Sequence, residues 1–193
     1  MGKKFLLFLV KDLIIDPAHA WETIAAENKP ASQISIGVLF PLSLLVSVSA
    51  VLGSLLYTNS GLSPVYSIFT GIECFITFYI SVYASSYILN KISFALDLGR
   101  NRLISFRLIV YSIVPFMLCQ MISRIFESLL FVDVLSIFGL YIFWIGAEKM
   151  LTPPANKKLP LLFGAFISFI GIFIAADFLF TKLFDKIFYT FFY

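Results

Sequence analysis

The hydrophobic residues of this chain lie in long runs that contain few or no charges. No charged residue occurs between Lys29 and Glu73, and a polar break at residues 58–64 divides that stretch in two. A helix needs about 20 apolar residues to cross a bilayer. The runs therefore predict an all-α polytopic membrane protein, a bundle of five transmembrane helices over residues 33–57, 65–90, 103–124, 128–147 and 159–181.

Of the four connections between predicted spans, the one between the third and fourth has the weakest turn signal. Its sequence from Arg124 to Ser128 contains no glycine or proline. One uninterrupted helix from Ser105 to Glu148 would be about 66 Å long at 1.5 Å per residue. That length is about twice the thickness of the hydrocarbon core, so we expect the chain to turn there.

Residues 1–32 are predicted to form two short helices at the inner membrane surface. Apolar residues recur at helical spacing in the first helix beside three lysines, a pattern typical of interfacial helices. Asp16 and Pro17 are typical of the N-cap and first position of the second helix. We expect Trp21 to anchor at the headgroups, and His19 to be structural or exposed.

Residues 182–193 follow the transmembrane domain at 33–181 and are rich in aromatic side chains. They are too few to cross the bilayer again. Their pattern predicts a helix that lies in the outer interface, where an aromatic belt is favourable. The alternative is a docking surface for another membrane protein, because aromatic residues make good anchors.

Composition excludes a soluble protein. Of the 193 residues, 60% are hydrophobic and only 13% are charged, with 23 phenylalanines among them. The mean hydropathy is +0.97. Soluble domains carry about 25% charged residues, so this chain could not cover its surface with polar groups in water.

The distribution of basic residues predicts the orientation. With the N-terminus inside, only Arg124, Lys182 and Lys186 of the 14 basic residues lie on the outer side. The eleven on the inner side are Lys3, Lys4, Lys11, Lys29, Lys91, Arg100, Arg102, Arg107, Lys149, Lys157 and Lys158. The positive-inside rule therefore predicts a cytoplasmic N-terminus and an external C-terminus.

Five charged residues lie within the predicted spans or beside them in the outer half of the bilayer: Glu73, Arg124, Glu127, Asp133 and Asp177. A charge near the membrane centre costs about 2.5–3.5 kcal/mol on insertion scales, so these groups should face inward and pair. Arg124 is the expected partner of Glu73 or Asp133. The cluster either clamps the bundle together or forms an outward-facing polar cavity for a lipid headgroup, an ion or a small solute.

Small residues recur every three or four positions in the first, second and fifth spans, for example Ser43, Ser47, Ala50 and Ser54. This pattern favours close helix packing over a polar path lined by hydroxyl groups. Pro115 is predicted to kink the third span, either as a hinge or as a fitted bend.

No motif indicates catalysis. The chain lacks HExxH, GxSxG and any Cys/His pair, and Cys74 and Cys119 lie within apolar runs. We therefore expect no catalytic residue, no cofactor and no metal site, and a protein that is not an enzyme.

The order of these elements resembles the Yip family of Rab-interacting membrane proteins, especially its small bacterial members. The residues that carry the resemblance are Asp16-Pro17, Trp21-Glu22-Thr23-Ile24, Val110 to Pro115, Tyr141, Gly146, Pro153-Pro154 and Lys157-Lys158. The family resemblance implies five spans with a cytoplasmic N-terminus. Tyr111 and Pro115 match the family pattern Gly-Tyr-x-x-x-Pro, with Val110 in the glycine place. Because the Asp-Leu-Tyr-Gly-Pro motif and the long N-terminal region are absent, Rab binding is not carried over.

The leading hypothesis is a non-enzymatic scaffold or adaptor that binds other membrane proteins or organises the bilayer. The alternative is a small lipid or solute carrier or channel subunit that uses the outward acidic cluster. The expected partners are the lipid bilayer and other membrane proteins, with no nucleic acid, and a homo-oligomer is compatible with the pattern. The expected location is the inner membrane of a bacterium.

Overall fold

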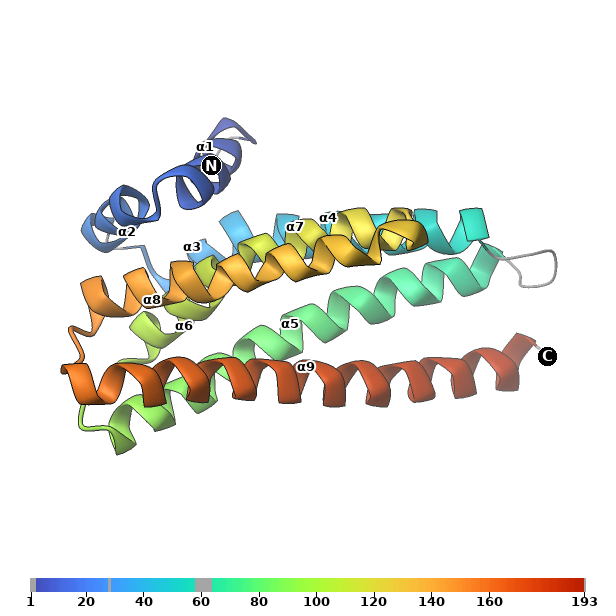
Figure 1. Cartoon of the computed structure of the whole chain (residues 1–193). Helices are drawn as coiled ribbons and strands as arrows, with labels where there is room; N and C mark the ends of the chain where they lie inside the picture. The colour runs from blue at the N-terminus through green and yellow to red at the C-terminus, as the bar shows by residue number, and fades with distance from the viewer. Residues whose placement is uncertain (1–2, 28, 58–63, 193) are drawn as a thin grey trace.

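The computed structural model describes residues 3–27, 29–57 and 64–192, and these fold into an elongated bundle of helices (Figure 1). Five stretches are long and apolar enough to cross a membrane: Ala31–Leu56, Pro64–Ala95, Arg102–Ile125, Phe131–Met150 and Ala155–Phe191. The predicted all-α fold with five spans is confirmed.

Several spans consist of more than one helical segment. The elements in chain order are α1 (Lys3–Ile15), α2 (Pro17–Ala26), α3 (Ala31–Ile34), the π-helix η1 (Ser35–Leu39), α4 (Phe40–Tyr57), α5 (Pro64–Ala95), α6 (Arg102–Ser112), α7 (Val114–Ile125), the 3-10 helix η2 (Glu127–Ile137), α8 (Phe138–Met150) and α9 (Ala155–Phe192). The first span thus runs from α3 to α4, the third is α6 with α7, and the fourth is most of η2 with α8.

The two predicted N-terminal helices are present as α1 and α2. The Asp16 side chain caps α2 by accepting a hydrogen bond from the His19 backbone N–H at 3.1 Å, and Pro17 is the first helical residue. His19 itself is exposed. In α1, Leu13 is fully buried against the rest of the chain, whereas Phe8 is 63% exposed. The first helix is therefore apolar on its free face as well as on its packed face.

The small residues of the first two spans bring α4 and α5 together, as predicted. The Ser47 hydroxyl donates to the Gly71 carbonyl oxygen at 2.6 Å, and the hydroxyl groups of Ser54 and Ser67 lie 2.9 Å apart. On the other side of α4, a Cβ atom added to Gly53 would collide with the Arg124 carbonyl oxygen of α7. The backbones of α4 and α7 therefore touch at this glycine.

The third span bends where Pro115 was predicted to kink it. The helix breaks at Ile113, whose φ of −85° and ψ of −3° separate α6 from α7. Ile113, Val114 and Pro115 are all buried. The Ser112 carbonyl oxygen lies against α8, only 2.5 Å from where a Cβ atom on Gly139 would be. The packing supports a fitted bend.

The predicted turn between the third and fourth spans is also present. Phe126 leaves the helical conformation with φ −124° and ψ 91°, and η2 begins at the next residue. The chain kinks at Leu129, whose φ of −103° and ψ of 23° are not helical. The fourth span, Phe131–Met150, therefore starts in a 3-10 segment that follows this kink, a feature that the hydrophobic pattern did not predict.

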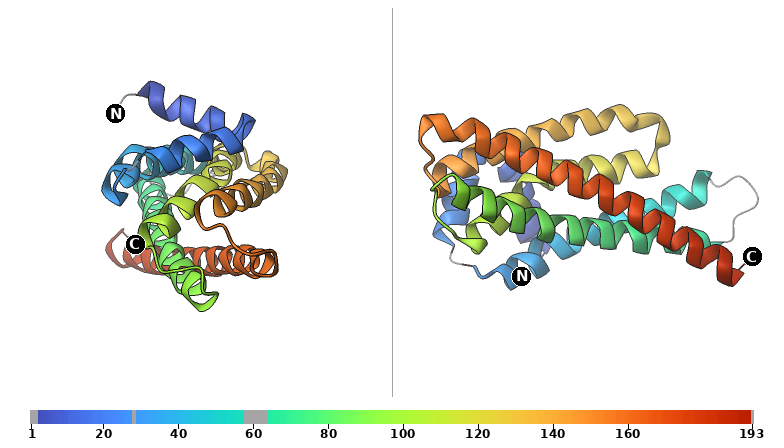
Figure 2. Two further views of the ribbon diagram at one scale, coloured as in Figure 1. Left: turned by 90° about the vertical axis from the view of Figure 1, so that its left-hand side faces the viewer. Right: turned by 90° about the horizontal axis from the view of Figure 1, so that it is seen from below.

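The C-terminal stretch does not form the separate interfacial helix that was expected. Residues 182–192 continue α9, which is 38 residues long and spans about 57 Å. Figure 2 shows α9 crossing α5 at a shallow angle. The Tyr66 hydroxyl donates to the Asp185 carboxylate at 3.2 Å, and Phe188 is fully buried beside the Tyr66 ring. Packing against α5 shields these rings from water, which explains why the helix continues.

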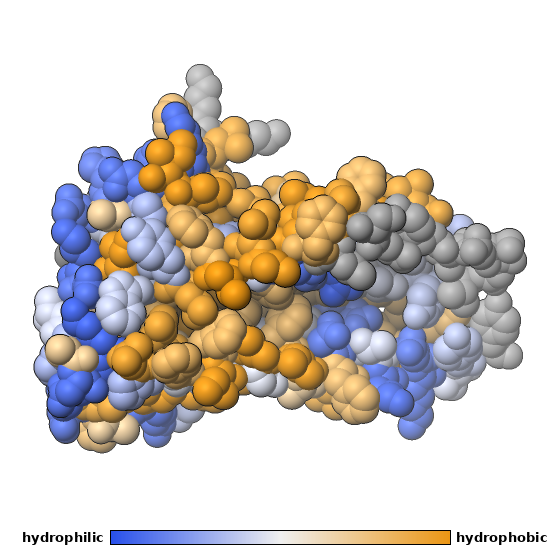
Figure 3. Space-filling model, viewed as in Figure 1, coloured by the Kyte–Doolittle hydropathy of each residue, from blue (hydrophilic) through white to orange (hydrophobic). Residues whose placement is uncertain are grey.

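Polar residues gather at one end of the bundle. This end carries α2, the linker between α5 and α6, and the linker between α8 and α9 (Figure 1). Figure 3 shows hydrophilic residues covering this end, a hydrophobic band over the middle of the molecule, and a smaller group of hydrophilic residues toward the opposite end. The arrangement places the predicted inner surface at one end, and the C-terminus lies at the opposite end.

Candidate functional site

The first notable site joins the N-terminal helices to the third and fourth spans. Trp21 of α2 is fully buried, so the expectation that it anchors at the headgroups is wrong. Its indole N–H donates to the Ile142 carbonyl oxygen at 2.9 Å. Its ring also meets the Tyr111 ring edge to face, with centroids 5.7 Å apart. The indole thus finds its hydrogen-bond partner inside the protein.

Gly146 makes room for this tryptophan. A Cβ atom at Gly146 would collide with the Trp21 ring. Trp21, Tyr111 and Gly146 therefore meet at one place, which we call the Trp21 contact, although they come from α2, α6 and α8. The sequence of α2 could have indicated that this helix packs against the protein. Its buried residues Pro17, Ala20, Trp21 and Ile24 share one helical face.

Ion pairs and a buried arginine surround the polar end of the bundle. Lys149 of α8 binds Glu22 of α2 at 2.5 Å, and the Lys149 ammonium lowers the pKa of the Glu22 carboxyl. The Arg107 side chain is only 4% exposed and donates to the Lys29 carbonyl oxygen at 2.8 Å. These contacts attach the N-terminal segment to the bundle at several points. They support a structural role for this region.

The five predicted intramembrane charges do not form one cluster. Arg124 lies 3.9 Å from the Asp177 carboxylate, and no ion pair between described residues joins it to Glu73 or Asp133, the partners that had been predicted. The Arg124 charge still acts on Glu73 at longer range. Glu73 instead accepts a hydrogen bond from the Thr181 hydroxyl at 2.5 Å. Both contacts reach α9, which was expected to end near these residues but continues past them. Asp177 and Thr181 both lie within the predicted fifth span, so the partners follow from how α9 packs against α5 and α7 and not from its length.

Asp133 lies apart from these groups. Its carboxylate accepts a hydrogen bond from the Ser123 hydroxyl at 3.1 Å, and no ion pair between described residues includes it. The side chain of Glu127 lies outside the part of the chain that the structure describes. Asp133 is therefore an intramembrane acid without a cation among the described side chains.

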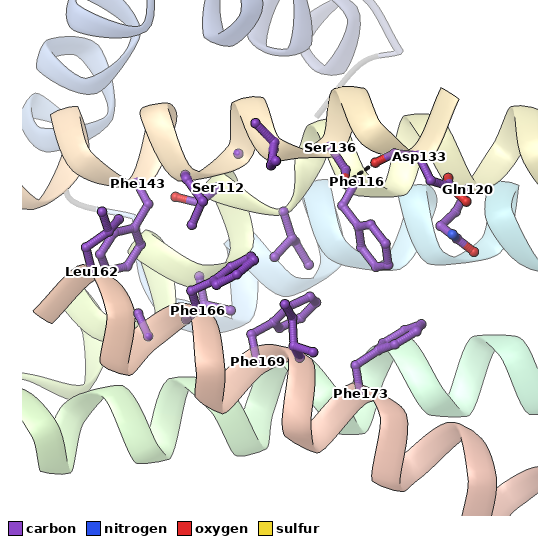
Figure 4. Close-up of a pocket in the computed structure, with 17 residues that line it drawn as sticks. Ser112, Phe116, Gln120, Asp133, Ser136, Phe143, Leu162, Phe166, Phe169 and Phe173 are labelled. Carbon is purple, nitrogen blue, oxygen red and sulfur yellow. Dashed lines mark hydrogen bonds between the residues drawn. The ribbon is translucent and has the colours of Figure 1, made fainter. Parts of the chain in front are cut away.

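Asp133 lines a cavity of about 360 Å³ between the third, fourth and fifth spans. In Figure 4, Phe166, Phe169 and Phe173 of α9 point into this space, and Gln120 and Asp133 lie together at one end. Most of the lining is apolar, and the polar side chains are Ser112, Gln120, Asp133 and Ser136. The sequence had allowed a polar cavity built from the acidic cluster, but Glu73, Arg124 and Asp177 do not line this one.

The structure offers no metal site among its described residues, where no group of three His, Cys, Asp or Glu side chains could hold an ion. Cys74 and Cys119 are both buried free thiols in different helices. Tyr111 and Pro115, the residues of the family-like motif, are buried too. Tyr111 packs on Trp21, and Pro115 follows the bend, so both have structural roles here.

Comparison with known proteins agrees with this architecture. A family model described as the Yip1 domain matches residues 11–179, from the first N-terminal helix to the C-terminal half of α9. No curated protein and no solved structure matches the chain significantly. Since the matched region covers most of the sequence, this five-span membrane protein belongs to the Yip1 domain family.

Proposed function

We propose that this protein is a non-enzymatic membrane scaffold that binds another membrane protein through the free face of α9. Family membership and the five-span fold support a role within the bilayer. The observation that carries the proposal is the exposure of the fifth span. Only 17% of its most apolar segment is buried, the smallest share among the five spans.

The free face of α9 has a shape that suits a partner helix. Gly164 packs closely on α5, since a Cβ atom added to it would lie 3.1 Å from the Ile92 Cδ1 atom. A Cβ atom added to Gly171 would meet nothing within 4 Å. Ala175, one turn further, is also exposed, and the larger Ile167 and Ile174 lie beside these two small residues. We call this exposed strip of small residues the α9 groove. Small residues let helix backbones approach closely where lipid provides no hydrophobic driving force. The occupant that fits is a transmembrane helix of another protein with small residues on its own face.

Filling this groove will abolish the partner contact. A photoreactive amino acid at Ile174, in native membranes, is expected to form a cross-link to one protein, at residues within a transmembrane helix of that protein. Gly171→Leu puts a large side chain where close approach is needed, so the cross-link yield should fall at least about 10-fold. Mass spectrometry of the cross-linked peptides measures both the identity and the yield.

Ile72→Phe on the exposed face of α5 is the matched control, because it enlarges a lipid-facing residue away from the groove. It should leave the yield unchanged. A cross-link that survives Gly171→Leu, or one that joins two copies of this chain, would contradict binding of a different protein at this face.

We also propose the inner membrane of a bacterium as the location, with the N-terminus in the cytoplasm and the C-terminus outside. The support is the 11-to-3 distribution of basic residues and the gathering of polar linkers at the end that carries α2 (Figure 3). Asn156→Cys and Thr190→Cys test the orientation, since both positions are exposed and lie near opposite ends of α9.

A membrane-impermeant maleimide added to intact cells or spheroplasts should label Thr190→Cys at once. Asn156→Cys should react only after permeabilisation. The unmodified chain is the control, because its two cysteines are buried. The reverse pattern would show that the C-terminus is inside.

A further inference from the structure

We propose that the cavity between the third, fourth and fifth spans binds one aminophospholipid, with an acyl chain along the phenylalanines of α9 and the amine of the headgroup on Asp133. The site is independent of the α9 groove described above, which lies on another face of the helix. The volume of the cavity, its opening to the bilayer and its polar groups all suit such a lipid.

The body of the cavity suits an aliphatic chain. Its volume of about 360 Å³ is within the range of small-molecule sites, and Phe116, Phe166, Phe169 and Phe173 form much of its wall. In Figure 4 the rings from α9 follow one another along the space toward Leu162 and Phe143. An apolar chain in this position would exchange contacts with other lipid chains for close contacts with the rings along its length.

The cavity is accessible from the bilayer. Two of its lining residues, Ile137 of η2 and Ile170 of α9, are 62% and 38% exposed. They stand on spans four and five, which are lipid-facing over much of their surface. A lipid can therefore enter sideways between η2 and α9, without leaving the membrane.

The polar groups are arranged for a zwitterionic headgroup. Among the described side chains, only the Ser123 hydroxyl binds the Asp133 carboxylate, so an ammonium group would supply the missing positive charge. The Gln120 oxygen accepts from the Arg124 guanidinium at 3.3 Å, which leaves the Gln120 amide N–H groups for a phosphate oxygen. Both side chains lie at the same end of the cavity (Figure 4).

Ser112 provides a second, independent indication of a ligand. Its hydroxyl lines the cavity, is 7% exposed as a residue, and has no hydrogen-bond partner among the described residues. A buried hydroxyl without a partner is costly, so such a group is normally satisfied. Ser112 lies eight residues before Gln120, about 12 Å along the span. An ester carbonyl of the same lipid, deeper than its headgroup, would accept this hydrogen bond.

The test uses the full chain in vesicles of phosphatidylethanolamine and phosphatidylglycerol. Each of three photoactivatable lipids is added in turn: phosphatidylethanolamine, phosphatidylcholine or phosphatidylglycerol, all with a diazirine in the same acyl chain. Phosphatidylethanolamine should label the peptides that contain Phe169 and Leu140 about 10-fold more than the other two. That ratio corresponds to about 1.4 kcal/mol of preference.

Asp133→Asn should reduce the phosphatidylethanolamine labelling to the level of the other lipids. Ile170→Trp should reduce labelling by all three, because it obstructs the rim. Ile174→Trp, on the same helix outside the cavity lining, is the matched control and should change nothing. Equal labelling of the unmodified chain by all three lipids would overturn the proposal. So would an Asp133→Asn protein that keeps the preference for phosphatidylethanolamine.

Discussion

Replacing Trp21 with alanine will loosen the N-terminal helices from the bundle and lower the free energy of unfolding by about 3–5 kcal/mol. The substitution removes a fully buried indole, its hydrogen bond to Ile142 and its ring contact with Tyr111. Thermal unfolding in mild detergent should show a decrease in Tm of about 10 °C. The backbone amides of α2 should exchange hydrogen much faster than in the unmodified chain.

Trp21→Phe is the matched variant, because it keeps an aromatic ring and removes the N–H donor. It should cost about 1 kcal/mol, the scale of one hydrogen bond. If α2 in Trp21→Ala exchanges as slowly as in the unmodified chain, the Trp21 contact does not hold the N-terminal helices in place.

Gly53→Val will have a comparable effect at the contact between α4 and α7. A Cβ atom there collides with the backbone carbonyl of Arg124, which cannot rotate away as a flexible side chain could. The two helices must move apart, with an expected loss of about 3 kcal/mol. Size-exclusion chromatography after a heat step measures the fraction that remains monodisperse.

The control for this substitution is Gly171→Ala in α9, where an added Cβ atom meets open space. A glycine-to-alanine change inside a helix stabilises by up to about 1 kcal/mol when nothing obstructs it. Similar heat resistance of Gly53→Val and the unmodified chain would show that α4 and α7 can separate without cost.

The spans were predictable because the requirement for about 20 apolar residues is a property of a continuous stretch of sequence. The bend at Pro115 was predictable for the same reason, since the missing N–H acts on the backbone of its own helix. The end of α9 was not. Whether residues 182–192 form an interfacial helix or a continued span depends on contacts with Tyr66 of α5, far away in the sequence.

The candidate site, too, was predictable only where a property of the local sequence decided it. Sequence identified Asp133 and Arg124 as unusual, because a charge in a span is costly wherever it lies. Their partners depend on how the helices are rotated and displaced relative to one another, which the single-sequence pattern does not contain. The cavity was missed for a similar reason. Its polar members Ser112 and Gln120 are ordinary residues in sequence and become notable only beside Asp133 and the rings of α9.

The Trp21 contact also bears on the order in which the protein can be assembled. Trp21 and Ile142 are 121 positions apart, so the indole is synthesised long before the fourth span that receives it. Contacts between distant positions form late, because a long stretch of chain must be ordered first. We therefore expect α2 to wait at the membrane surface, without its final partners, until α8 has been inserted. Helix α2, although it is synthesised before all five spans, is thus among the last elements to reach its native position.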